Sequence, residues 1–318
     1  MELPDPLQAE LDRASHVLQD LAGEDVDTIS VKAGAPDEAP FMARIVSKLS
    51  PMVGNLMEQR IVSILDADAS EGYSWERQDP GFPDAILKHL DVATTAGYEI
   101  KAWYVLSTEI TGRFRESLNL LAGKNINVVI VAWCMSNMVF GTPKVLGVLT
   151  VSGEELASSR DTHYHNPPEY LIEEPNDTTA RTANLQQSNV NGFKLQDRGD
   201  KRLLAEERAR TWPRIDPHSP EAQAEVQRLK AILPYRLDTN FAKIDRVGNA
   251  EVEAFKWDIL GSTYLNKTIR QWSSIFSDLN SAEDRKREKA EKVIEDLYSS
   301  MLVAEPRTEV VRETPDAH

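Results

Sequence analysis

Apolar residues recur at helical spacing near both ends of the chain. An amphipathic helix is predicted over residues 7–22, and a second helix begins near Phe41. A third helix begins at Ser50-Pro51, where Ser can cap the helix and Pro is tolerated in its first turn. The pattern predicts four more helices beyond Pro220, at residues 221–233, 250–260, 268–279 and 282–302.

Between these helical stretches, the pattern changes to that of strands. Residues 126–133 form a nearly continuous apolar run, which is typical of a strand buried on both faces. Other strands are predicted at residues 73–77, 82–92, 98–105 and 145–151, with a helix at residues 111–122 that ends at Gly123. This order predicts an α/β fold with a mixed central sheet flanked by helices, followed by a mainly helical C-terminal region.

The strand at residues 98–105 carries the candidate chemistry. Successive side chains of a strand point to opposite faces, so Glu99 and Lys101 share one face and Ile100 points toward the core. Asp84 can reach the same face from the preceding strand. Glu58 lies on the apolar stripe of the third helix, where a carboxylate is costly without a metal, a cation or a hydrogen-bond partner. A narrower stripe would instead leave Glu58 solvated.

Asp79 and Asp91 are rivals for the role of Asp84. Asp79 precedes Pro80-Gly81 and is predicted to lie in a turn. Asp91 leaves only seven residues before Glu99, which is tight for a hairpin that brings both carboxylates to one metal. Asp84 is therefore the preferred candidate.

The motif Pro83-Asp84, fourteen residues and Glu99-Ile100-Lys101 resembles the signature of the PD-(D/E)XK nuclease superfamily, which includes many type II restriction endonucleases. The resemblance covers roughly residues 45–150 and implies a restriction-endonuclease-like core. It implies that Asp84, Glu99 and the Ile100 carbonyl bind Mg²⁺, with Mn²⁺ able to substitute. Lys101 would orient or deprotonate the attacking water, and Glu58 would be an additional acidic residue of the site. The implied partners are double-stranded DNA, a second copy of the chain and a cognate DNA methyltransferase that acts separately.

Composition separates an acidic N-terminal helix and linker (1–40) from the rest of the chain. The resemblance implies that residues 41–200 form the nuclease core, and the apolar pattern predicts a helical C-terminal region at residues 201–318. The amide-rich stretch at residues 182–196 could read DNA, because Asn and Gln can pair with adenine and Lys and Arg with guanine or phosphate. Alternatively, it is a polar surface loop. The candidate reading residues are Asn184, Gln186, Gln187, Asn189, Lys194 and Arg198.

Charge and composition narrow the function classes. The formal net charge is −15, which argues against indiscriminate nucleic-acid binding because that binding depends on neutralising phosphates. A single cysteine, Cys134, excludes an intramolecular disulfide and indicates a reducing, cytoplasmic setting, and the resemblance implies a prokaryotic one. No apolar run is long enough for a membrane span, and no signal peptide is expected. A repair or recombination nuclease without sequence specificity and a non-catalytic binding protein remain as alternatives.

Overall fold

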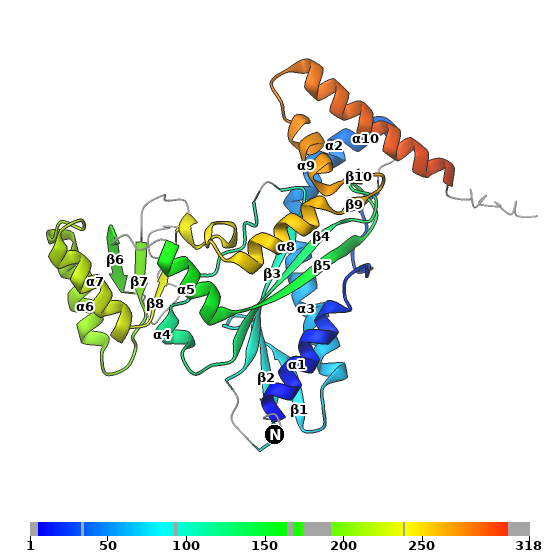
Figure 1. The fold of residues 1–318 in the computed structure, drawn as a ribbon. Coiled ribbons are helices and arrows are strands. Elements are labelled where there is room, and N and C mark those ends of the chain that lie inside the picture. Colours follow the sequence, from blue (N-terminus) through cyan, green and yellow to red (C-terminus); the bar gives the residue numbers. More distant parts are fainter. Residues whose placement is uncertain are drawn as a thin grey trace, which may run out of the picture.

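The computed structural model describes most of the chain, and Figure 1 shows how its elements are arranged. The described residues are 6–32, 35–91, 95–107, 109–163, 168–173, 192–237 and 239–304. No helix within these ranges is long and apolar enough to cross a membrane.

A five-stranded sheet lies at the centre of the molecule. Its strands, in spatial order, are β1 (Tyr73–Arg77), β2 (Ala85–His89), β3 (Gly97–Tyr104), β4 (Ile126–Met135) and β5 (Pro143–Ser152). Strands β3 and β4 pair in parallel, and the other neighbouring strands pair antiparallel. The predicted α/β fold with a mixed sheet is therefore confirmed, and each predicted strand is present.

Helices cover both faces of this sheet. Their bounds are α1 (Pro6–Gln19), α2 (Ala39–Val46), α3 (Ser50–Asp68), α5 (Gly153–His163), α8 (Ala250–Gly261), α9 (Ile269–Asp278) and α10 (Asp284–Ala304). Gly54 of α3 lies against Ala102 of β3, whereas Phe255 of α8 packs edge-on against the Trp103 ring. Neighbouring residues of a strand face opposite ways, so α3 and α8 lie on opposite faces. Strand β4 is buried between them from Val128 to Met135, as its apolar run predicts.

The helices predicted near the C-terminus are confirmed. Thr268 caps α9 through a capping box with Gln271, which explains why that helix begins there. Trp272 of α9 and Ile294 of α10 are almost completely buried and belong to the same hydrophobic cluster as the central sheet. The last helices are therefore part of the main core.

A second hydrophobic cluster forms a side lobe, which comprises residues 168–173, 192–237 and 239–242. Its small sheet has β7 in the middle, parallel to β6 and antiparallel to β8. The lobe lies beside the central sheet in Figure 1. Its elements are β6 (Tyr170–Glu173), β7 (Gly192–Leu195), α6 (Arg202–Thr211), α7 (Pro220–Ile232) and β8 (Tyr235–Leu237). The predicted domain boundaries at residues 40 and 200 stay a prediction.

The helix predicted over residues 111–122 is wrong. Only α4 (Leu118–Leu121) is helical, and the preceding residues 109–117, called here the crossing segment, form isolated bridges with other segments. The Phe114 amide donates to the Ala242 carbonyl at 2.9 Å, and the Leu237 amide donates to the Arg115 carbonyl at 2.9 Å. Backbone pairing with distant segments replaces the hydrogen bonds that a helix would have made within itself.

Smaller differences concern helix and strand ends. Ser50 does not cap α3, because the 3₁₀ turn η2 (Ser47–Leu49) runs directly into that helix. Strand β2 begins after Pro83, which has no amide hydrogen to donate to a neighbouring strand. Helices α5 and α6 were not predicted, and both have polar sequences with weak apolar periodicity.

Candidate active site

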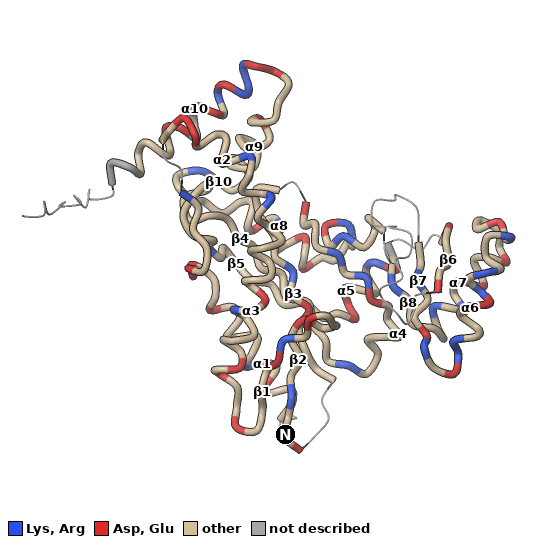
Figure 2. Tube along the Cα trace, turned by 180° about the vertical axis from the view of Figure 1, so that it is seen from behind, with Lys and Arg blue, Asp and Glu red and all other residues tan. Residues whose placement is uncertain are grey.

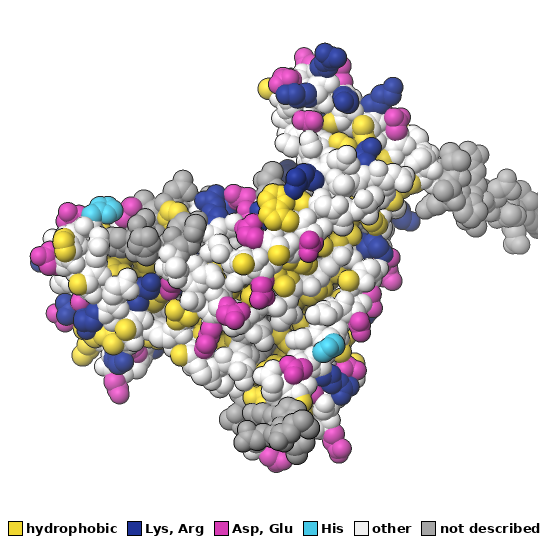
Figure 3. Space-filling view, in the orientation of Figure 1, with side chains coloured by type: hydrophobic (Ala, Val, Ile, Leu, Met, Phe, Trp, Pro, Cys, Tyr) yellow, Lys and Arg dark blue, Asp and Glu magenta, His cyan; other side chains and the backbone are white. Residues whose placement is uncertain are grey.

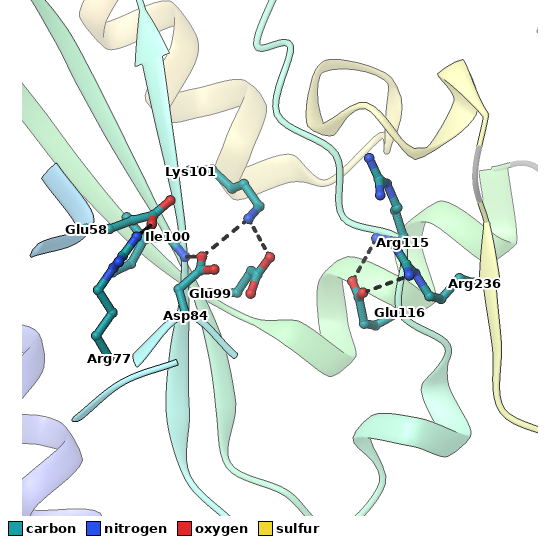
Figure 4. A network of polar contacts seen from close by, with 9 residues as sticks. All are labelled: Glu58, Arg77, Asp84, Glu99, Ile100, Lys101, Arg115, Glu116 and Arg236. Carbon is teal, nitrogen blue, oxygen red and sulfur yellow. Dashed lines mark hydrogen bonds and ion pairs between the residues drawn. The ribbon is translucent and has the colours of Figure 1, made fainter. Parts of the chain in front are cut away.

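Asp84, Glu99 and Lys101 converge at the edge of β3 nearest to β2 (Figure 4). The Lys101 Nζ donates to Asp84 Oδ2 at 3.4 Å and also to Glu99 Oε1. Ile100, between them, is buried. The predicted sharing of one face by Glu99 and Lys101, and the predicted reach of Asp84, are therefore confirmed.

The backbone fixes the position of Asp84. The Ile100 amide donates to Asp84 Oδ2 at 2.7 Å, and the Asp84 carbonyl accepts from the Gln78 amide at 2.8 Å. Gly97 lets β2 and β3 approach closely here, since a Cβ at this position would lie only 2.3 Å from the Ala85 carbonyl oxygen. The carboxylate is thus held at the start of β2 by neighbours on both sides.

Glu99 is a buried carboxylate with an unsatisfied oxygen. Only 9% of the residue is exposed, and Glu99 Oε2 has no hydrogen-bond partner among the described residues. Burial raises the pKa of Glu99 to about 7, with Asp84 and Glu116 also raising it and Lys101 opposing them. An orphaned buried oxygen is costly, so a further cationic or hydrogen-bonding partner at Glu99 Oε2 would lower the free energy of this arrangement.

Lys101 is held in its charged form. Burial alone would lower its pKa, but the neighbouring Glu99 and Asp84 carboxylates outweigh burial and raise it. Gly112 of the crossing segment lies beside the Lys101 side chain, where an added Cβ would be only 3.3 Å from Lys101 Cβ. In this arrangement Lys101 is a hydrogen-bond donor and a positive charge, not a proton acceptor.

Glu58 has the cation that its position on α3 requires. Arg77 of β1 donates to Glu58 Oε2 at 3.0 Å, and the two side chains are only 22% and 26% exposed. Burial is the largest influence on the pKa of Glu58 and raises it, while Arg77 and Lys101 lower it and Asp84 raises it. Glu58 therefore lies within electrostatic range of the Asp84 group, but its direct partner is Arg77.

The two rival aspartates lie away from Glu99. Asp79 is mainly exposed and forms an ion pair with Arg77 at 3.1 Å. Asp91 is exposed beyond the end of β2, where its amide donates to His89 Nδ1 at 3.2 Å. Asp84 is the one of the three that Lys101 contacts.

Glu116 is a neighbour of the site that the sequence did not reveal. It is buried, its Oε2 accepts from the Arg115 amide at 2.9 Å, and Arg236 of β8 lies 3.9 Å from its Oε1. Figure 4 shows this group beside Glu99. Its residues come from the crossing segment and the side lobe, so no spacing in the sequence connects them with Glu99.

The predicted DNA-reading residues fall mainly outside the described part of the chain. Lys194 lies on β7 and is largely buried, directly opposite Arg236 of β8, and Arg198 follows β7. Figure 2 shows Lys and Arg positions around α5 and β8 interspersed with Asp and Glu positions, and acidic side chains are spread over the face drawn in Figure 3. The residues outside the described ranges are Asn184, Gln186, Gln187 and Asn189.

The residues present fit a divalent cation that also binds water and substrate. Among the described residues, no three His, Cys, Asp or Glu side chains are gathered closely enough to hold a metal ion unaided. Mg²⁺ needs fewer, because it keeps several waters and binds through one or two carboxylates and a substrate phosphate. The unpartnered Glu99 Oε2 beside Asp84 matches this requirement.

Comparisons of the chain with models of protein families, with curated proteins and with solved structures found no match.

Proposed function

We propose that this chain is a Mg²⁺-dependent endonuclease that hydrolyses phosphodiester bonds of double-stranded DNA at a specific site, like a type II restriction enzyme. The observation that carries the proposal is the convergence of Asp84, Glu99 and Lys101, in which the buried Glu99 Oε2 has no hydrogen-bond partner among the described residues. The motif in which these residues lie, together with the mixed sheet, also supports a restriction-endonuclease-like core.

Asp84 and Glu99, with the Ile100 carbonyl, would hold the metal, and Mn²⁺ would substitute for Mg²⁺. When bound, such an ion lowers the pKa of a bound water and neutralises charge that develops on the phosphate. The Ile100 amide keeps Asp84 oriented for this role. Glu58 adds a negative charge beside Asp84.

Lys101 would act as a cation. Its raised pKa favours orienting the attacking water and stabilising negative charge on the transition state over removing a proton. Glu116 and Arg236 border the site and would contribute to its electrostatics.

Cutting both strands of a symmetric sequence requires two active sites, so we propose a homodimer. The amide-rich stretch with Asn184, Gln186, Gln187, Asn189, Lys194 and Arg198 would contact the DNA. A separate cognate methyltransferase would protect the host genome, and the setting would be the cytoplasm of a prokaryote.

Plasmid cleavage tests this proposal. The wild-type chain should cut supercoiled DNA with Mg²⁺ or Mn²⁺, and Asp84→Ala and Lys101→Ala should each reduce the rate by at least about 100-fold. Arg228→Ala, which removes an exposed cation from α7, is the matched control and should cut normally. If both site variants cut DNA as fast as the wild-type chain does, the proposed nuclease function is wrong. Discrete fragments indicate sequence recognition, whereas a smear indicates the non-specific nuclease.

One observation favours a second candidate, a non-catalytic binding protein. Lys101 already bonds both carboxylates, as in a structural ion-pair cluster. If Mg²⁺ and Mn²⁺ neither bind nor raise the melting temperature and no DNA is cut, this candidate replaces the nuclease.

A further inference from the structure

Arg77 is the feature of the site that the proposed function leaves without a role. It stands at the end of β1, directly opposite Ala85 of β2, the residue that follows Asp84. Its guanidinium bonds Glu58 on one side at 3.0 Å and Asp79 on the other at 3.1 Å. These contacts fix a permanent positive charge beside the proposed metal site, because guanidinium does not lose its proton in proteins.

Glu58 and Glu99 lie on different sides of Asp84. Figure 4 shows Glu58 and Arg77 on one side of Asp84, and Glu99 and Lys101 on the other. Asp84 thus has a neighbouring carboxylate on each side, and each of these carboxylates is bonded to a cationic side chain. Without Arg77, Glu58 and Asp84 would form a second pair of carboxylates able to attract a divalent cation.

We propose that Arg77 keeps Glu58 from binding a divalent cation, so that the site takes a single Mg²⁺ at Asp84 and Glu99. This inference rests on the proposed function, since it concerns the same metal site. A second cation at Glu58 would have to displace a hydrogen-bonded guanidinium and would be repelled by it at close range. At the first position Lys101 bonds Glu99 Oε1, but the buried Glu99 Oε2 has no hydrogen-bond partner among the described residues and can accept a cation. Glu58 thereby acts on the site through its charge and not as a metal ligand.

Removing the charge of Arg77 should allow a second divalent cation to bind at Glu58. In Arg77→Met the side chain keeps much of its apolar length, while Glu58 loses its counterion beside Asp84. Titration with Mn²⁺, followed by calorimetry and by the loss of the free-ion electron paramagnetic resonance signal, reports the number of ions bound without any need for activity. We expect one ion in the wild-type chain and two in Arg77→Met.

Matched variants separate the role of Arg77 from a general change in charge. Arg77→Lys retains the cation and should bind one ion. Arg60→Met loses the same charge from the exposed part of α3 and should also bind one. Glu58→Gln combined with Arg77→Met removes the ligand that the second ion would need and should return the number to one. If Arg77→Met does not fold, Arg77→Gln loses the same charge and gives the same measurement.

The outcomes distinguish this inference from the proposed function. A wild-type chain that binds no Mn²⁺ overturns both. One ion in both the wild-type chain and Arg77→Met overturns the inference alone, as do two ions in the wild-type chain. A second ion that appears in Arg77→Met and disappears in the double variant supports it.

Discussion

Glu99 gives the protein a stability that depends on pH. Its pKa is raised from 4.5 to about 7 in the folded chain, mainly by burial, so the folded state binds the Glu99 proton more tightly than the unfolded state does. The stabilisation is complete below the ordinary pKa and is lost as pH rises toward 7.

Glu99→Gln tests this dependence. Because Gln does not titrate, the free energy of unfolding of the variant should decline less than that of the wild-type chain between about pH 4.5 and pH 7. Urea denaturation without divalent cations at several pH values measures the difference. Equal slopes for the two proteins would show that Glu99 has an ordinary pKa.

Gly97 is the residue whose missing side chain allows Asp84 to reach the site. In Gly97→Ala the new Cβ would meet the Ala85 carbonyl oxygen at 2.3 Å and Pro83 Cγ at 2.6 Å, so β2 must shift. We expect a loss of about 1–3 kcal/mol in stability and a lower affinity for Mn²⁺. Thermal unfolding and Mn²⁺ titration measure the two effects. Gly261→Ala, at a position with no atom within 4 Å of the added Cβ, is the control and should leave both unchanged.

At the residue scale, the sequence predicted the members of the site better than their surroundings. Alternation along β3 and the short distance from Asp84 were sufficient to bring Asp84, Glu99 and Lys101 together. Glu116 could not be found in this way, because it reaches the site through long-range folding of the crossing segment. The partner of Glu58 was equally hidden, since it depends on how α3 lies against β1.

Among the elements, the crossing segment shows where local pattern fails. Its sequence permits a helix, but its backbone groups pair with the 3₁₀ turn η5 (Asn240–Ala242) and with β8. By contrast, β4 was predicted by its apolar run, because burial on both faces of a sheet leaves a clear pattern. Strand β1 was predicted with its observed ends although it lies at the edge of the sheet. Tertiary pairing decides the segments that lack such a pattern.

Arg160 of α5 is hydrogen-bonded to the backbone of the crossing segment. It is fully buried, donates to the Phe114 carbonyl at 2.9 Å and pairs with Asp161 at 3.0 Å. Arg160→Met should cost about 1–3 kcal/mol, because it leaves the Phe114 carbonyl unsatisfied, while Asp161 keeps Lys230 at 3.5 Å as a cationic partner. Chemical denaturation measures the loss. Arg228→Met removes an exposed ion pair with Glu225 and should cost at most about 1 kcal/mol.

At the scale of the whole molecule, the main core is assembled from both ends of the chain. Its cluster includes Leu11 of α1 and Ile294 of α10, while the side lobe has a cluster of its own from the residues between them. The sequence indicated helices near both ends but not which sheet they would cover. Apolar periodicity identifies a buried face without identifying its partner.

A core mutation in α10 tests this arrangement. Ile294 is fully buried, so Ile294→Ala should lower the free energy of unfolding by about 2–5 kcal/mol and lower the melting temperature of the central sheet. Tryptophan fluorescence and circular dichroism measure both. Trp257→Ala, which truncates an exposed ring on α8, should have a much smaller effect. If Ile294→Ala melts at the same temperature as the wild-type chain, α10 and the central sheet do not share a core.

The late position of α8–α10 in the chain has a consequence during synthesis. As the nascent chain leaves the ribosome, β1–β5 emerge first with a face that Phe255 and Ile259 later cover. That apolar face stays open while the side lobe is being translated. A chaperone that binds exposed apolar strands therefore has a defined interval in which to act, and the interval closes when α8 docks.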